Sequence, residues 1–145
     1  MRFINHVRLE FDARPENESF ARVAVSAFVV PLNPTLDVLS DLRTAVSEAV
    51  TNAIVHAYDE KGGTIVLAAS IREDGRMFLS VSDEGCGIEN IDRAMQPFFT
   101  TQPEKERSGM GFSVMQSFMD SVEVTSTPGK GTCVSMEKVI SPPIQ

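Results

Sequence analysis

A chain of 145 residues with 42% hydrophobic residues is long enough to bury one core and short for two, so we expect a single domain over residues 1–145. The formal net charge of −7 argues against nonspecific nucleic-acid binding, because neutralising phosphates requires clustered Lys and Arg. No segment has the length of a signal peptide's apolar region or of a membrane span, which predicts a cytoplasmic protein that does not bind a membrane.

The first part of the chain predicts one strand and two helices. Residues 7–13 alternate apolar and polar, as a half-buried strand does, and from Pro15 to Val30 the apolar period becomes helical. A long second helix is expected from Pro34 through Ala57, with Asn33 as its N-cap. The inward faces of the two helices are expected to comprise Phe20, Val23, Ala24, Ala27 and Phe28, and then Leu36, Leu39, Leu42, Val46 and Val50.

The middle of the chain predicts a hairpin, a short helix and a loop. Strand-like runs at 64–72 and 76–82 are joined by Asp74 and Gly75, a strong hairpin signal. A short helical piece is expected at 91–95. The following residues, 96–109, are rich in polar residues and chain breakers, which is typical of a mobile loop.

The last part of the chain predicts a helix at 110–120 and two strands that flank a turn at 128–131, followed by a frayed tail at 140–145. The complete order of elements is β-α-α-β-β-α-α-β-β. This order favours an α/β (α+β) two-layer sandwich, with a mixed, mostly antiparallel sheet covered by helices on one face.

Three polar residues, Glu48, Asn52 and His56, recur at intervals of four in the second predicted helix, so we expect them to lie on one helix face. Apolar Ala, Val and Ile residues surround them in the sequence. A polar row beside such a core must be hydrogen-bonded, hold an ion or line a cavity. Taken alone, the row is more often structural than catalytic.

Three glycine-containing motifs follow this row. D-E-G-C-G-I at 83–88 is by default a turn, and G-K-G-T at 129–132 is by default a hairpin turn. S-G-M-G-F at 108–112 opens a predicted helix, where free N–H groups suit phosphate. Each motif is weak by itself, and their order after the polar row is much more specific.

That order resembles the N, G1, G2 and G3 boxes of the GHKL ATPase superfamily, which has a Bergerat-type ATP-binding fold. Within it, the segments ARPENESFARV, SEAVTNAIVHAY, PFFTTQPEKERSGMGF and FMDSVEV resemble the sporulation branch of the small bacterial anti-sigma factor kinases. The resemblance extends over residues 7–137. It implies ATP or ADP and Mg²⁺ as cofactors.

The resemblance also implies roles for individual residues. Glu48 would be the general base, and Asn52 would contact magnesium, an ion that prefers oxygen ligands. Asp83 would accept a hydrogen bond from the adenine amino group. His56 is expected to pack or to hydrogen-bond rather than to catalyse. The remaining nucleotide contacts are expected to be Gly85, Gly87, Arg107, Ser108, Gly109, Gly111 and Thr132, with Arg107 on the γ-phosphate because a guanidinium bonds two oxygens.

The function that the resemblance implies is a serine protein kinase that also acts as an anti-sigma factor. Its partners would be sigma factor F, an anti-anti-sigma protein as substrate, and a second copy of the chain in a homodimer. Arg22, four residues after Glu18 on the first helix, is by default half of a surface ion pair, and the resemblance makes it a partner contact.

Three alternatives remain. The general-stress branch of the same kinases has the same boxes and a different sigma partner. A non-catalytic ATP-dependent binding module is disfavoured by the intact Glu48. The ATP-binding half of a sensor histidine kinase would need a phosphoaccepting histidine on a helical hairpin, and the sequence contains His6 and His56 alone.

Overall fold

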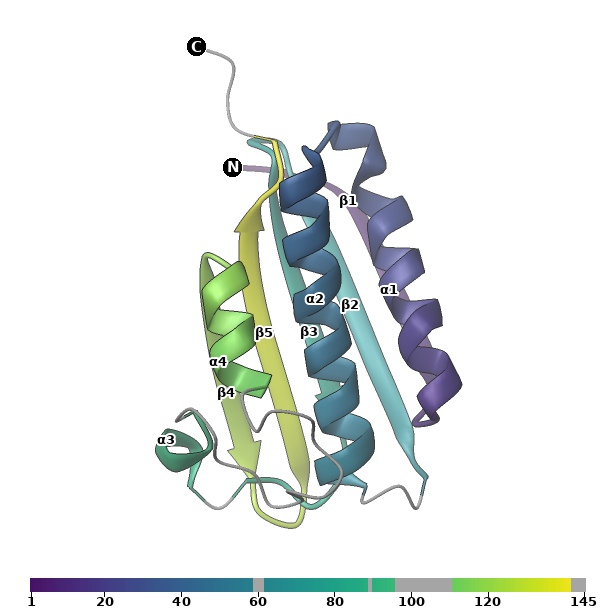
Figure 1. Ribbon diagram of the computed structural model, residues 1–145, viewed down its shortest axis with the longest axis vertical. Coiled ribbons are helices and arrows are strands. Elements are labelled where there is room, and N and C mark those ends of the chain that lie inside the picture. Colours follow the sequence, from purple (N-terminus) through teal and green to yellow (C-terminus); the bar gives the residue numbers. More distant parts are fainter. Residues whose placement is uncertain (59–61, 89, 96–110, 142–145) are drawn as a thin grey trace.

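The computed structural model describes residues 1–58, 62–88, 90–95 and 111–141 of the chain. Its strands form one sheet in the order β1-β2-β3-β5-β4, with antiparallel pairing between all neighbours. Helices α1, α2 and α4 lie on one face of this sheet (Figure 1). The strands are β1 (Phe3–Asp12), β2 (Thr64–Arg72), β3 (Arg76–Asp83), β4 (Ser121–Thr127) and β5 (Gly131–Val139), and the helices are α1 (Pro15–Val29), α2 (Leu36–Asn52), α3 (Ile91–Ala94) and α4 (Gly111–Phe118). The predicted two-layer fold and order of elements are confirmed.

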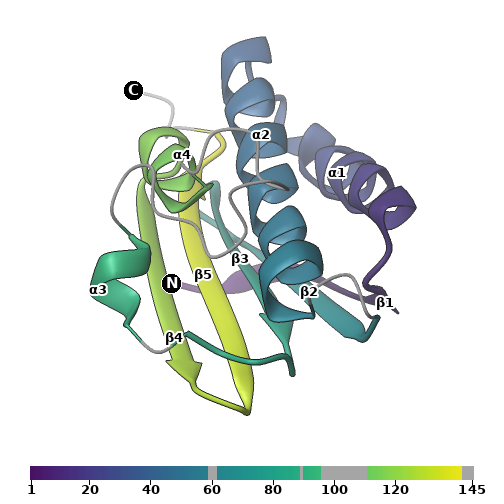
Figure 2. The same ribbon diagram turned by 60° about the horizontal axis from the view of Figure 1, so that its bottom comes forward.

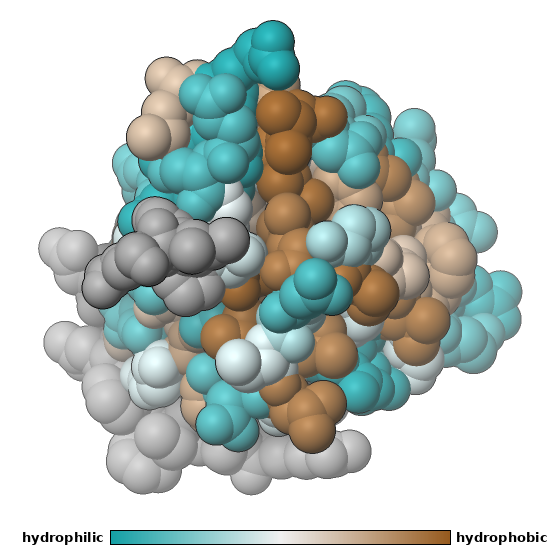
Figure 3. Space-filling view, turned by 90° about the horizontal axis from the view of Figure 1, so that it is seen from above, coloured by the Kyte–Doolittle hydropathy of each residue, from teal (hydrophilic) through white to brown (hydrophobic). Residues whose placement is uncertain are grey.

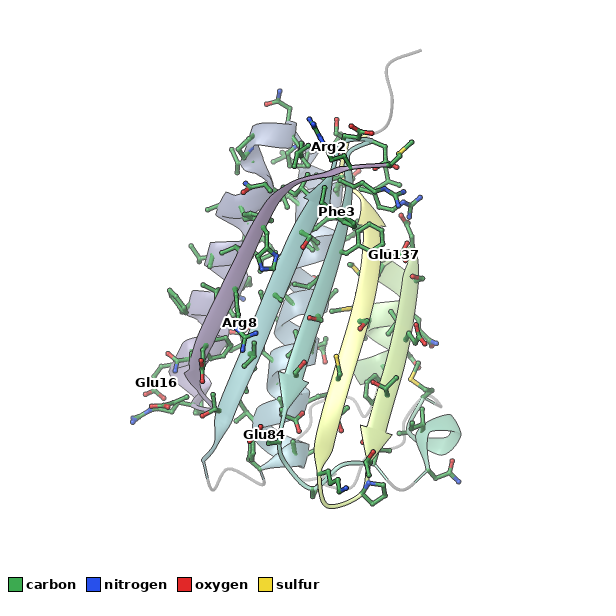
Figure 4. All side chains as sticks on the ribbon, turned by 180° about the vertical axis from the view of Figure 1, so that it is seen from behind. Arg2, Phe3, Arg8, Glu16, Glu84 and Glu137 are labelled. Atoms are coloured by element: carbon green, nitrogen blue, oxygen red, sulfur yellow. The ribbon has the colours of Figure 1, made fainter. Side chains whose placement is uncertain are left out.

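The core lies between the sheet and the helices. Along β2 and β3 buried residues alternate with less buried ones, so one face of each strand is apolar and points at the helices. Ile65 and Leu67 of β2 and Val46 of α2 are completely buried. Among the described residues no helix covers the opposite face of the sheet, and Figure 4 shows Phe3, Arg8 and Glu137 on that open side.

Helix α1 turns a different face to the core than the apolar pattern predicts. Its buried residues are Ala21, Val25 and Val29, whereas Phe20 and Val23 are 52% and 59% exposed. The expected inward face is therefore wrong for Phe20 and Val23, and also for Ala27, which is exposed. Both apolar stripes have helical spacing, so periodicity alone does not determine which one packs on α2. Leu36, also expected inward, is 84% exposed at the start of α2.

Helix α2 also begins and ends differently from the prediction. Its N-cap is Thr35, whose Oγ1 accepts a hydrogen bond from the Val38 N–H at 3.2 Å. Asn33 instead has a left-handed φ of 53° and ends the short 3₁₀ turn η1 (Val30–Leu32). At the other end, α2 continues as a π turn, η2 (Ala53–Ala57). Because a π turn is wider than an α turn, His56 does not extend the regular four-residue row of Glu48 and Asn52.

Other local predictions are confirmed. The β2–β3 hairpin turns at Gly75, where φ is +85°, and the last two strands pair around a turn at residues 128–130. The predicted mobile loop at 96–109 and the last four residues of the predicted tail lie outside the described residues. Within the described part of the chain, no helix is long and apolar enough to cross a membrane.

Candidate functional site

Four elements bring the predicted site residues to one end of the molecule. This end contains the last turns of α2, the end of β3, the turn between β4 and β5, and the loop that follows β3 (Figure 2). Asp83 is the last residue of β3, and Thr132 is the second residue of β5. Antiparallel pairing places these two residues directly opposite each other. Residues separated by about fifty positions in the sequence are therefore neighbours here.

Asp83 is a half-buried carboxylate with a defined hydrogen-bond partner. Its Oδ1 accepts a hydrogen bond from the Gly85 N–H at 2.9 Å. Burial raises the pKa of the Asp83 carboxyl, and the backbone N–H groups of Gly85 and Thr132 oppose that rise. A half-buried carboxylate suits a ligand that donates an N–H.

The loop after Asp83 is held between η2 and the β4–β5 turn. The Cys86 N–H donates to the Ala57 carbonyl at 2.9 Å, and the Gly129 N–H donates to the Cys86 carbonyl at 2.6 Å. A Cβ at Gly85 would overlap the Ala57 carbonyl oxygen, and Gly87 has a φ of +75° beside the Thr127 carbonyl. Both glycines are therefore needed for the packing of the loop, and their contact with a nucleotide stays a prediction.

Tyr58 is a structural residue of this site that the sequence reasoning missed. Its hydroxyl donates to the Thr64 carbonyl at 2.7 Å and accepts a hydrogen bond from the Glu84 N–H at 2.7 Å. Tyr58 thereby connects the end of η2 to the start of β2 and to the loop after β3. An aromatic residue one position beyond the expected helix end was the available signal.

Glu48 and Asn52 lie one turn apart on α2, and both are half-buried. Their helix neighbours Ala49 and Val50 are 2% and 0% exposed, so the two polar residues border the core as expected. Among the described residues, no three His, Cys, Asp or Glu side chains gather into a metal site. A single amide oxygen fits Mg²⁺ only where nucleotide phosphates and water complete its coordination, which is the usual way in which this ion binds.

The remaining predicted site residues belong to α4, to α1 and to a segment outside the described residues. Gly111 is the first residue of α4 and is buried, and α4 packs against α2. Arg107, Ser108 and Gly109 lie outside the described residues. Arg22 lies on α1, where its Nη1 is 3.7 Å from Glu18 Oε1, so the expected ion pair is confirmed. A shallow depression of about 330 Å³ near Asp12 and Gly63 is lined by none of the predicted nucleotide residues.

Comparison with known proteins finds relatives over nearly the whole chain. The family described as histidine kinase-like ATPase domain matches residues 11–138. An anti-sigma F factor of Geobacillus thermodenitrificans is 56% identical over 137 residues, which cover 94% of each chain. An anti-sigma F factor of Clostridium kluyveri is 56% identical over 138 residues, which cover 94% of this chain and 96% of that one.

Solved structures share the fold. The RsbU and RsbW domains of a Mycobacterium tuberculosis protein align with a TM-score of 0.70 and 19% identity over 98% of this chain and 34% of that one. The catalytic domain of the histidine kinase ThkA aligns with a TM-score of 0.57 and 17% identity over 99% of this chain and 100% of that one. At these identities the likeness concerns the fold alone.

Proposed function

This chain belongs to the anti-sigma F factor family of histidine kinase-like ATPase domains, and on that premise we propose that it is an ATP-dependent serine protein kinase that sequesters sigma factor F. Its substrate is a serine of an anti-anti-sigma protein, and it acts in the cytoplasm. The observation that best supports this proposal is the gathering of Asp83, Thr132 and the end of α2 at one end of the fold.

The proposed chemistry divides between the two polar residues of α2. Glu48 accepts the proton of the attacking serine hydroxyl, because a half-buried carboxylate is a suitable base for this step. Asn52 supplies one amide oxygen to Mg²⁺. The ion, when bound with ATP, neutralises charge on the phosphates. Asp83 accepts a hydrogen bond from the adenine amino group, and Gly111, with Arg107, Ser108 and Gly109, contributes to phosphate binding.

Helix α1 is the proposed face for protein partners. Arg22 lies on this helix, and its Nη2 donates to Ser19 Oγ at 3.4 Å in addition to the ion pair with Glu18. On the same helix Phe20 and Val23 are exposed, and Val30 follows at 53% exposure. Figure 3 shows a band of apolar residues at the surface on the upper end of the molecule. Clustered exposed apolar side chains are typical of protein interfaces. We assign the surface of helix α1 to partner binding and homodimer formation.

Transfer of the γ-phosphate label from ATP to a purified anti-anti-sigma protein tests the proposal. The unmodified chain should label the protein on serine. Glu48→Gln should lower the rate by about 100-fold or more, the usual contribution of a positioned base, while ATP affinity persists. Asp37→Asn, an exposed carboxylate on the same helix, is the matched control and should label normally.

The outcomes separate the alternatives. ATP binding without any labelling by the unmodified chain would favour the non-catalytic binding module. A near-normal rate for Glu48→Gln would show that this carboxylate is structural. Capture of a general-stress sigma factor in preference to sigma factor F, with ATP present, would place the chain in the other branch of the anti-sigma kinases.

A further inference from the structure

Ser126 occupies a central position that the proposed function does not use. It lies on β4 directly opposite Thr132 of β5, at the end of the sheet where Asp83 ends β3. Within the part of the chain that the structure describes, its Oγ makes three contacts: the Ile88 N–H donates to it at 2.8 Å, the Gly131 carbonyl lies at 2.9 Å, and Thr132 Oγ1 lies at 2.8 Å. One hydroxyl thus joins the loop after β3 to both strands of the last hairpin.

The three contacts determine where the hydroxyl protons lie. A serine hydroxyl has one proton to donate and two lone pairs to accept with, and a carbonyl oxygen only accepts. The Ser126 proton must therefore point at the Gly131 carbonyl, because otherwise two bare oxygens would face each other at 2.9 Å. Because Ser126 then has no proton left to donate, the proton between Ser126 and Thr132 must come from Thr132. No other arrangement places a proton in each of the three contacts.

The consequence concerns Thr132. Its only hydroxyl proton is used by Ser126, so towards a ligand the Thr132 oxygen can act only as a hydrogen-bond acceptor. Across the β3–β5 pairing lies Asp83, whose carboxylate is also an acceptor. Two neighbouring acceptors match a group that carries two N–H donors, such as the exocyclic amino group of adenine. They repel a carbonyl oxygen at the same position.

We propose that Ser126 is a positioning residue for nucleotide selectivity: it orients the Thr132 hydroxyl as an acceptor, so that Asp83 and Thr132 together select a purine with an amino group over one with a carbonyl oxygen. This inference rests on the proposed nucleotide function of the same site. Ser126 touches no ligand itself, and its effect is transmitted through the direction of one hydroxyl proton.

Competition between ATP and inosine triphosphate tests this role, because inosine carries a carbonyl oxygen where adenosine carries the amino group. The unmodified chain should prefer ATP. In Ser126→Ala the Thr132 proton is free to turn towards the ligand, so the ratio of ATP to inosine triphosphate affinity should fall by about three- to tenfold, the value of one hydrogen bond. Ser126→Thr retains a hydroxyl and should restore the ratio. Ser121→Ala, on an exposed position of the same strand, should not change it.

A second variant shows whether Ser126 acts through Thr132. Thr132→Val removes the hydroxyl and should lower the ratio by itself, and adding Ser126→Ala to it should cause no further fall. This cycle also keeps the test decisive if Ser126→Ala does not fold, because an unchanged ratio in Thr132→Val would overturn the inference. Equal weakening of both nucleotides in Ser126→Ala would show a merely structural role and overturn it as well.

Failure of the proposed function has a different signature. If the unmodified chain binds neither nucleotide, the ATPase assignment of the site is wrong and the inference is lost with it. If it binds ATP and retains its preference while the ratio is insensitive to Ser126→Ala, the proposed function stands and only the role of Ser126 is rejected.

Discussion

Asp83 and Thr132 face each other across the β3–β5 pairing, and the Thr132 backbone N–H counteracts part of the rise that burial causes in the pKa of the Asp83 carboxyl. The carboxylate is thus held in a half-buried place with fewer water contacts than a surface acid has. A ligand N–H that donates to this carboxylate compensates for the hydrogen bonds to water that burial removes. A change at Asp83 should therefore have a strong effect on ligand binding.

Asp83→Asn should weaken ATP binding while the fold survives. The amide replaces one acceptor oxygen with a donor NH₂ group, and a mispaired polar group in a half-buried place costs about 1 to 3 kcal/mol, or roughly tenfold to over a hundredfold in affinity. Calorimetric titration with ATP measures the change. Glu84→Gln alters the exposed neighbouring carboxylate and should bind ATP normally. In the unmodified chain, equal affinities for ATP and GTP would argue against the adenine contact.

The stability of the nucleotide-free protein should depend on pH through Asp83. Because burial raises the folded-state pKa above the ordinary value of 3.8, the folded protein retains this proton longer than the unfolded chain does. The contribution of Asp83 to the free energy of unfolding should therefore fall as the pH rises from about 3.8 through the raised pKa. Urea unfolding at several pH values, compared with Asp83→Asn, isolates this contribution. A difference between the two proteins that is constant with pH would contradict it.

Gly85→Ala should damage the site more than an ordinary glycine substitution. Its Cβ would overlap the Ala57 carbonyl oxygen, which is the acceptor for the Cys86 N–H, so the loop must move away from η2. We expect a loss of about 1 to 3 kcal/mol in the free energy of unfolding, as for overpacked positions, together with weaker ATP binding. Gly129→Ala is the control, since its Cβ meets open space and only its φ of +79° is strained. Similar losses in both variants would show that the overlap is relieved elsewhere.

Asn52→Ala should weaken ATP binding only where magnesium takes part. Removing the amide oxygen takes away the one protein ligand proposed for the ion, so the gain in ATP affinity on adding Mg²⁺ should shrink, while affinity in excess chelator should change little. Titrations with and without Mg²⁺ measure both quantities. An equal loss in the two conditions would assign Asn52 to direct nucleotide contact or to packing instead.

The order of elements could be predicted from the sequence because it depends on local signals. The Asp74 and Gly75 pair predicts a tight turn, and the structure has φ +85° at Gly75. Alternation of apolar residues likewise located β2 and β3 within a residue of their observed ends. The candidate site residues on α2, β3 and β5 were predicted through the order of short motifs, each confined to a few consecutive positions.

Tertiary contacts determine the features that local sequence signals do not predict. Helix α1 has two apolar stripes of equal period, and packing against α2 buried Ala21 and Val25 and left Phe20 exposed. The proposed role of Ser126 could not be inferred from its own segment, because one of the three contacts of its hydroxyl comes from Ile88, 38 residues away in the chain. Periodicity and turn chemistry describe neighbours in sequence. Which stripe is buried, and which way a hydroxyl proton points, depends on groups that only the folded chain brings together.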